Sequence, residues 1–304
     1  WARSVTVEPH DFSRGRMSAP TTRFMWYFAG TSTHMIPGAD DAITRDGKAL
    51  ILAYDHGLEH GPVDFEPVPA TTDPSTVFDV GTHDAVTAVA VQKGVAEAYY
   101  PSYEDDVTLL AKLNGTSNLW MGEPDSAVNW SVDYAAEVGA DAIGFTLYGG
   151  SNHEVEMAEE FRQAQEQARE HDMGVVMWSY PRGQGLKDDT SPDTIAYASR
   201  LGLELGADIA KVKYPGPADA MHWAVRSAGD MKVVMSGGSK TSDEAFLSTV
   251  REAMDAGASG LAVGRNVFQR ENPEAILDGL EAVIFDDASV DEALSASAGL
   301  EASD

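Results

Sequence analysis

Residues 206–214 read Gly-Ala-Asp-Ile-Ala-Lys-Val-Lys-Tyr, and they join the end of an expected helix to a short apolar strand. The same Gly-Ala step recurs at residues 139–140 and 257–258, each time between a helical pattern and an apolar run. Glycine favours the end of a helix because its backbone adopts the left-handed conformation of a C-cap at little cost. The recurrence indicates that one helix–loop–strand unit is repeated along the chain.

From about residue 46, short apolar runs alternate with helical stretches, which is typical of a parallel α/β sheet. Clear helices are expected at residues 154–171, 191–205 and 242–256. The repetition predicts an α/β fold, a (β/α)8 TIM barrel of about 240 residues. The alternative is an open doubly wound sheet, although no G-x-G-x-x-G motif follows the first strand. Eight strands are expected, at residues 49–54, 85–92, 108–113, 142–148, 175–179, 209–212, 233–236 and 260–263.

The composition excludes several classes of protein. Among 304 residues, 49 are acidic and 21 are Lys or Arg, which gives a net charge of −28. Such self-repulsion is tolerable where salt screens it, so we expect the salt-adapted surface of a halophile's protein rather than an ordinary acidic one. No basic stripe is available for nucleic acid. Cysteine is absent, which excludes disulfides and thiolate catalysis. No apolar run reaches the roughly 18 residues of a membrane-spanning helix, and we expect a cytoplasmic protein.

Three regions of the chain differ in composition. Residues 1–34 carry four arginines against two acidic residues and show no periodicity, so a disordered or non-native extension is expected. Residues 35–285 are expected to form a single catalytic domain. Residues 286–304 are rich in acidic residues, Ala and Ser, and are expected to form an acidic tail that contains a last helix.

Lysine is scarce, yet three of the eight lysines, Lys112, Lys211 and Lys213, fall in expected strands. Lys211 and Lys213 lie two residues apart and therefore point to the same face of one strand. Burying an ammonium group costs several kcal/mol. Either the amines pair with buried carboxylates such as Asp55, or burial and a cationic neighbour lower the pKa of one of them. A lysine of the second kind can form a Schiff base with a ketone.

Polar residues and glycines gather at the expected carboxyl ends of the strands, where a TIM barrel has its active site. Loops after the seventh and eighth strands of such barrels frequently bind phosphate, through backbone N–H groups exposed by glycine and through arginine. The residues expected to bind phosphate in this way are Ser236, Gly237, Gly238, Gly264 and Arg265. A second phosphate would meet one of four basic residues, Lys187, Arg182, Lys240 or His60.

The segment His56-Gly-Leu-Glu59-His60 matches H-x-x-E-H, a pattern of zinc peptidases. That pattern needs a helix, so that both histidines share one face. Here the segment follows a strand and is bounded by Gly61 and Pro62. We therefore expect a loop whose His and Asp groups face a substrate, and no metal.

Five longer motifs stand at the strand ends: Ala53-Tyr-Asp55-His-Gly-Leu-Glu-His-Gly-Pro62, Trp178-Ser-Tyr180-Pro-Arg-Gly183, residues 206–214, Met235-Ser-Gly-Gly238 and Ala262-Val-Gly-Arg265-Asn-Val-Phe-Gln-Arg270. In consistent order over residues 46–285, the sequence closely resembles the archaeal-type class I fructose-bisphosphate aldolases in these motifs. It departs from the family in the loop Tyr214-Pro-Gly-Pro217, where Tyr-Thr-Gly-Asp is expected.

The resemblance implies a Schiff-base enzyme without metal or cofactor, often a homodecamer of pentameric rings. Its expected reaction is the reversible cleavage of fructose 1,6-bisphosphate to dihydroxyacetone phosphate and glyceraldehyde 3-phosphate. Lys211 is implied as the Schiff-base lysine, Tyr180 as the acid/base and Asp55 as the carboxylate. Trp178 is implied to lie near the substrate, and we expect Lys213 beside Lys211 as a cation that helps to keep it unprotonated.

Three alternatives stay open at this point. One is another Schiff-base aldolase or transaldolase-like enzyme, such as an archaeal aminodideoxyheptulosonate synthase of aromatic biosynthesis. A second is a metal-dependent barrel enzyme that uses His56 and His60, and a third is a barrel that binds a phosphosugar without catalysis. For the fructose-bisphosphate aldolase that the resemblance implies, the only expected partners are a phosphosugar substrate and other copies of the chain.

Overall fold

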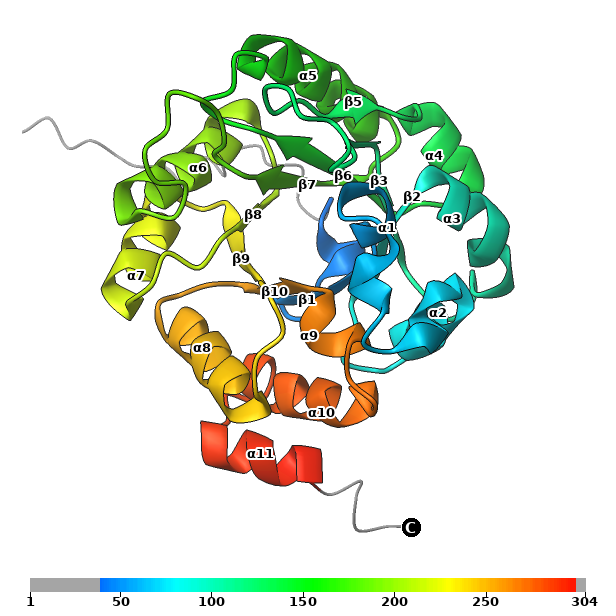
Figure 1. Ribbon diagram of the computed structural model, residues 1–304, viewed down its shortest axis with the longest axis vertical. Helices are drawn as coiled ribbons and strands as arrows, with labels where there is room; N and C mark the ends of the chain where they lie inside the picture. The colour runs from blue at the N-terminus through cyan, green and yellow to red at the C-terminus, as the bar shows by residue number, and fades with distance from the viewer. Residues whose placement is uncertain (1–38, 299–304) are drawn as a thin grey trace, which may run out of the picture. The chain divides into compact units, whose positions relative to one another are not determined.

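The structure, a computed structural model, describes residues 39–298, in which eight parallel strands close into a barrel. Each strand pairs with the next one round the barrel, and the last pairs with the first. The predicted (β/α)8 TIM barrel is confirmed, and Figure 1 shows it along its axis with the helices outside the strands. The barrel strands are β1 (Ala49–Ala53), β2 (Ala88–Gln92), β3 (Leu109–Lys112), β6 (Ala142–Leu147), β7 (Gly174–Ser179), β8 (Ile209–Val212), β9 (Lys232–Ser236) and β10 (Gly260–Val263).

Helices follow the barrel strands, and the three helices predicted from the sequence begin and end within about one residue of their predicted bounds. Serine N-caps fix two of their beginnings: the hydroxyl groups of Ser191 and Ser242 accept hydrogen bonds from backbone N–H groups of the first turn. The longer helices are α2 (Pro74–Gly81), α3 (Lys93–Tyr99), α4 (Val132–Val138), α5 (Glu154–Glu170), α6 (Pro192–Leu205), α7 (Ala218–Ser227), α8 (Asp243–Asp255), α10 (Pro273–Ile284) and α11 (Val290–Ala298).

The Gly-Ala steps end helices as predicted. Gly139 and Gly206 are the C-cap residues of α4 and α6, with φ of 99° and 87°. Gly257, just after α8, also has a positive φ, of 94°. Only glycine takes this conformation without a steric penalty, which explains why each helix stops there and turns into the next strand.

Successive side chains of a strand point to opposite faces of the sheet, and this divides the apolar core into two layers. An outer layer lies between strands and helices, and an inner layer fills the barrel with side chains such as Ile51, Leu110, Val176 and Ile209. Two residues further along β3, β7 and β8, the inward positions are held by Lys112, Trp178 and Lys211. The inner layer therefore changes from apolar to polar at the carboxyl ends of the strands.

Several short elements were not predicted. A two-stranded antiparallel sheet joins β4 (Asn114–Gly115) to β5 (Ala127–Val128), beyond the end of β3. Two helices of one turn follow barrel strands, α1 (His56–Glu59) after β1 and α9 (Arg265–Phe268) after β10. The remaining short elements are 3-10 turns, at Asp41–Ile43, Pro62–Phe65, Pro69–Thr72 and Tyr100–Ser102.

The predicted domain boundaries stay predictions. The expected extension at residues 1–34 lies outside the described residues, as does the end of the expected acidic tail. Within the tail region, α11 packs against α10 and α8. Across residues 39–298, none of the helices combines the length and the apolar character that crossing a membrane requires.

Candidate active site

A cavity of about 340 Å³ opens at the carboxyl ends of the barrel strands. All the predicted site residues except Lys240 line it. Of the four candidates for the second phosphate, Arg182 and His60 line the cavity, whereas Lys240 and Lys187 do not. The Nζ of Lys240 instead donates a hydrogen bond of 2.6 Å to the backbone carbonyl of Gln269. The lining is Asp55, His56, Glu59, His60, Trp178, Tyr180, Arg182, Thr190, Lys211, Lys213, Tyr214, Ser236, Gly237, Gly238, Ser239, Ala262, Gly264 and Arg265.

Lys211 lies at the bottom of this cavity with 5% of its surface exposed. Its Nζ is 4.7 Å from the centroid of the Trp178 ring. Burial lowers the pKa of Lys211; Asp55 and Glu59 act against this shift, whereas Lys112 and Arg265 add to it. The lowered pKa favours the neutral amine, which is the nucleophilic form of lysine.

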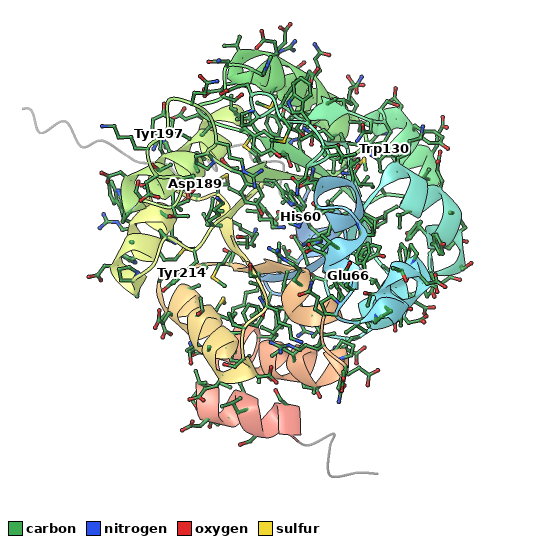
Figure 2. The ribbon with its side chains drawn as sticks, in the orientation of Figure 1. His60, Glu66, Trp130, Asp189, Tyr197 and Tyr214 are labelled. Atoms are coloured by element: carbon green, nitrogen blue, oxygen red, sulfur yellow. The ribbon has the colours of Figure 1, made fainter. Side chains whose placement is uncertain are left out.

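Lys213, which the sequence suggested as a free cation beside Lys211, is paired with a carboxylate. Its side chain is 26% exposed and forms an ion pair with Asp189, in the loop between β7 and α6. Figure 2 labels Asp189 on this loop, beside α6. The nearby cations that lower the pKa of Lys211 are Lys112 and Arg265. Strand geometry does give Lys211 and Lys213 a shared face, but β8 ends at Val212, so Lys213 extends to the mouth of the cavity and finds a carboxylate there.

Two carboxyl groups, the buried Asp55 and the partly buried Glu59, respond in opposite ways to one environment. Burial raises the pKa of Asp55, but Lys211, His56 and Lys112 together outweigh burial and hold it below its ordinary value. Burial also raises the pKa of Glu59, and there the neighbouring cations do not compensate. Asp55 is therefore the ionised partner of Lys211, and Glu59 holds a proton more readily.

Tyr180 follows β7 and is partly buried against the inner core. Burial, together with Asp55 and Glu59, raises its pKa well above the ordinary value for tyrosine. The Arg182 guanidinium, 6.0 Å from the centroid of the Tyr180 ring, acts in the opposite direction. In the free protein Tyr180 is a phenol that can donate a proton.

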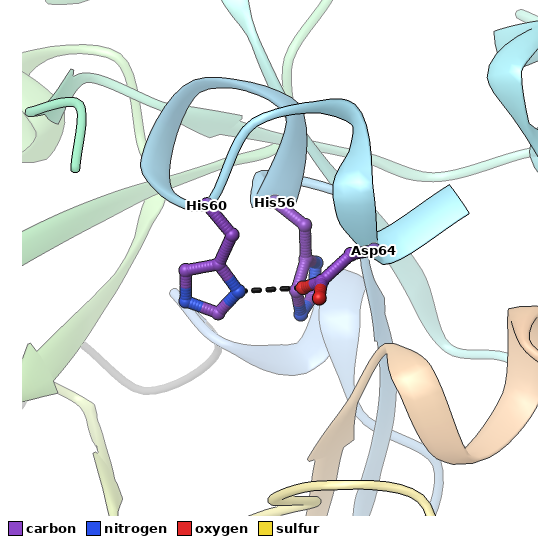
Figure 3. Close-up of side chains that lie close together, drawn as sticks. All are labelled: His56, His60 and Asp64. Carbon is purple, nitrogen blue, oxygen red and sulfur yellow. Dashed lines mark hydrogen bonds and ion pairs between the residues drawn. The ribbon is translucent and has the colours of Figure 1, made fainter. Parts of the chain in front are cut away.

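The segment after β1 is a one-turn helix, α1, and not the expected loop. His60 Nδ1 lies 2.6 Å from Asp64 Oδ2, and Figure 3 marks this contact with a dashed line. The ring centroids of His56 and His60 are 5.2 Å apart. Ligand atoms of His56, His60 and Asp64 come within 4.8 Å of one another. Asp64, however, is already engaged by His60 and lies 3.9 Å from Arg265 Nε. A cation beside the carboxylate disfavours a metal ion there, and His60 and Arg265 both line the cavity as groups able to bind an anion.

The two glycine-containing loops are shaped by close backbone approach. A Cβ at Gly264 would lie 2.2 Å from His56 and 2.6 Å from the carbonyl oxygen of Ala53, so no other residue fits. Gly238 has a φ of 65°. The buried amide of Asn266 joins the loops, because its Nδ2 donates to the carbonyl groups of Gly237 and Ser239 at 2.7 Å and 2.9 Å. The result is a pre-formed concave surface beside Arg265.

Comparison with known proteins agrees with this geometry. A family model described as DeoC/LacD family aldolase matches residues 49–270. The chain belongs to this family. It is 78% identical over 260 residues to a fructose-bisphosphate aldolase class 1 of Halobacterium salinarum, covering 86% of this chain and 99% of that protein. A fructose-bisphosphate aldolase class 1 of Thermoproteus tenax is 43% identical over 252 residues, covering 83% and 95%.

Solved aldolase structures have the same architecture. The crystal structure of an archaeal fructose 1,6-bisphosphate aldolase has a TM-score of 0.78 and 43% identity, covering 81% of this chain and 97% of that one. A second archaeal aldolase structure, with its catalytic lysine covalently bound to the carbinolamine intermediate of the substrate, has a TM-score of 0.77 and the same identity and coverage. The chain is thus a class 1, Schiff-base type member of the aldolases, as its motifs indicated, and its similarity to a Halobacterium protein is consistent with a halophile.

Sequence reasoning missed several residues that line the aldolase cavity. Glu59 was noted only within the histidine motif, and its place beside His60 was the available signal. Thr190 lies in the loop between β7 and α6, where no sequence pattern singles out one residue. Asn266 lies outside the lining but holds the two glycine-containing loops together. It follows Arg265 directly within the strand-end motif of residues 262–270, and this position was the available signal.

Proposed function

We propose that this aldolase cleaves fructose 1,6-bisphosphate reversibly to dihydroxyacetone phosphate and glyceraldehyde 3-phosphate, through a Schiff base on Lys211. One observation carries the proposal: a buried lysine with a lowered pKa shares a cavity with a glycine-lined, arginine-flanked concave surface. Anchoring a phosphate there would fix the reacting carbonyl near the amine. The names of the close relatives in Halobacterium and Thermoproteus support this choice of substrate.

The covalent chemistry begins with the neutral amine of Lys211, which attacks the C2 ketone and forms a carbinolamine. Loss of water gives the protonated imine, which draws electrons as the C3–C4 bond breaks. The aldehyde leaves, the resulting enamine takes a proton at C3, and water then releases dihydroxyacetone phosphate. Asp55, the ionised carboxylate beside Lys211, orients the groups that exchange protons while the carbinolamine forms and loses water.

Tyr180 handles the proton of the C4 hydroxyl group in this proposal. Its raised pKa makes it a phenol in the free enzyme, suited to protonate the aldehyde oxygen when the C3–C4 bond forms. In the cleavage direction the same proton moves back to the tyrosine oxygen. The positive charge of the imine beside it stabilises the phenolate that this reverse step requires.

The two phosphates of the substrate go to two groups of residues. We assign the phosphate next to C1 to the loops of Ser236, Gly237, Gly238, Gly264 and Arg265. Of the four candidates for the second phosphate, Arg182 and His60 line the cavity, and we assign it to them. Lys213 also lines the cavity and would assist where a phosphate competes for it with Asp189.

A homo-oligomer of pentameric rings and a cytoplasmic location complete the proposal. An assembly would cover apolar side chains that the described part of this protomer exposes, among them Leu119 and Met121, each 91% exposed. Sedimentation analysis in high salt tests the assembly, and a monomer at micromolar concentration would contradict it.

The deciding experiment traps the imine. The protein is incubated with fructose 1,6-bisphosphate and borohydride in high salt, and the adduct is mapped by mass spectrometry. An adduct on Lys211, lost in Lys211→Ala together with turnover, is expected. An adduct on another lysine would refute the assignment. Loss of activity in a chelator, without any trapped adduct, would favour a metal-dependent enzyme instead, and an adduct without cleavage of this substrate would favour another Schiff-base aldolase.

A further inference from the structure

Lys112 is a lysine that the reaction described above leaves without a role. It is the last residue of β3, and none of its surface is exposed. It points into the barrel, in the layer that also holds Trp178 and Lys211. A lysine buried so deeply costs several kcal/mol unless its charge is used or fully solvated by the protein.

The surroundings of Lys112 are built for a charged amine. Its Nζ lies 2.6 Å from the backbone carbonyl of Asn114, 3.3 Å from the side-chain oxygen of Asn114 and 3.5 Å from Glu59 Oε1. These are three acceptors, which match the three N–H donors of an ammonium group. A neutral amine has only two donors, and its lone pair would face an acceptor. The amide oxygen of Asn114 is itself fixed, since it accepts a hydrogen bond of 2.7 Å from the backbone of Thr146.

Lys112 and Lys211 lie against the same indole ring. Their Nζ atoms are 5.5 Å and 4.7 Å from the centroid of Trp178. Since the ring is 1% exposed, little water separates the two amines, and a charge on one is felt strongly by the other. The closest acceptor of Lys112 is the neutral carbonyl group of Asn114. The carboxyl group that pairs with it, Glu59, lies farther away at 3.5 Å, and burial raises the pKa of that group, which weakens its compensation of the Lys112 charge.

We propose that Lys112 is a positioning residue of this active site, whose positive charge keeps Lys211 in the neutral form that attacks the substrate. The inference rests on the proposed Schiff-base function of Lys211. It replaces the part that sequence spacing suggested for Lys213, whose charge is paired with Asp189.

The other charged groups around Lys211 do not replace Lys112. Asp55 and Glu59 are carboxyl groups and favour the protonated amine. His56, partly buried beside Asp55, has its pKa lowered to about 4 and is neutral at physiological pH. Arg265 acts in the same direction as Lys112, but it lies beside Asp64 and faces the phosphate that we assign to it, so its charge is compensated when the substrate binds.

The pH dependence of kcat/KM tests this inference, because its acid limb reports the ionisation of the free enzyme. In Lys112→Met, the midpoint of the acid limb should move up by about one pH unit, which lowers kcat/KM about tenfold below both midpoints and leaves it unchanged well above them. Lys112→Arg keeps the charge and should restore the wild-type midpoint. If Lys112→Met does not fold, Lys112→Gln carries the same test, because it can still donate to Asn114 and has no charge.

Lys213→Met is the matched control, since it removes the other nearby lysine. It should leave the midpoint in place, whatever it does to KM. An unchanged midpoint in the uncharged Lys112 variants, or an equal shift in Lys112→Arg or Lys213→Met, would overturn the inference. Mapping of the borohydride adduct distinguishes a failure of the proposed function from a failure of this inference. The absence of an adduct on Lys211 in the wild type would refute the proposed function. An adduct on Lys211 together with unshifted midpoints in the Lys112 variants would refute only the role of Lys112.

Discussion

Trp178 and Lys211 occupy directly paired positions on β7 and β8, and the amine of Lys211 lies 4.7 Å from the centroid of the indole ring. Both side chains point into the barrel, where the ring forms the boundary between the apolar inner core and the cavity. The ring shields one side of the amine from water. It therefore contributes to the burial that is the main cause of the lowered pKa of Lys211.

Truncation of Trp178 should destabilise the barrel as well as the site. Trp178→Ala removes a side chain that is 1% exposed and should lower the free energy of unfolding by about 3–5 kcal/mol. Trp178→Phe keeps a ring against the amine and should cost clearly less. Denaturant titration in high salt measures both, and equal stability of the two variants would show that the indole is not packed as described.

Removal of the Tyr180 hydroxyl group should separate proton transfer from imine formation. Tyr180→Phe should lower kcat by about 10²–10⁴-fold, since the C4 hydroxyl group loses its acid/base partner. Borohydride should still trap an adduct on Lys211, because carbinolamine formation does not need this hydroxyl group. Tyr134→Phe, which loses a hydroxyl group bonded to Glu97 on the outer surface, is the control and should keep wild-type turnover. If Tyr180→Phe retains full activity, another group handles the proton.

Arg265 should govern substrate binding more than turnover. Arg265→Leu removes charge-assisted hydrogen bonds worth about 1.5–3 kcal/mol, so KM should rise about 10–100-fold. Arg265→Lys should recover part of this loss, because a lysine keeps the charge but not the bidentate geometry. Arg226→Leu, on the exposed face of α7, serves as a control for charge alone. Steady-state kinetics decide, and a KM near that of the wild type would place the phosphate elsewhere.

His56 should make the folded state less stable in mild acid. Burial lowers the pKa of His56 from 6.5 to about 4, so between these values the unfolded chain binds a proton that the folded protein does not. Stability must then fall as pH decreases from about 6.5 towards about 4. His56→Gln should reduce this dependence, measured by denaturant titration at constant ionic strength. His153→Gln, at the N-cap of α5, should not reduce it. An unchanged dependence in His56→Gln would mean that His56 is not held neutral.

Much of the barrel could be read from local pattern. The glycines at 139, 206 and 257 end helices because their φ angles are positive there, and this depends only on the residue and its neighbours in the chain. The one-turn helix α1 was missed because Gly57 and Gly61 argue for a loop, whereas tertiary contacts help to hold the turn, such as the packing of the His56 ring on Phe268 at 5.1 Å between ring centroids. The β4–β5 sheet was missed because strands of two residues carry no periodicity.

The predicted site residues came together because parallel strands bring their carboxyl ends to one end of the barrel, and this follows from the order of strands alone. Lys240 was an exception, since the direction of a loop side chain depends on its contacts, here the carbonyl group of Gln269.

The sequence by itself determined the repeated unit, the inward face of each strand and the set of residues at the strand ends. Only the tertiary structure decided which of them touch: Lys112 and Lys211 lie far apart in the chain yet against one ring, while Lys213, two residues from Lys211, pairs with Asp189. The physical reason is that charge interactions follow distance in space. Closure and register of the barrel set those distances, and spacing along a single strand does not.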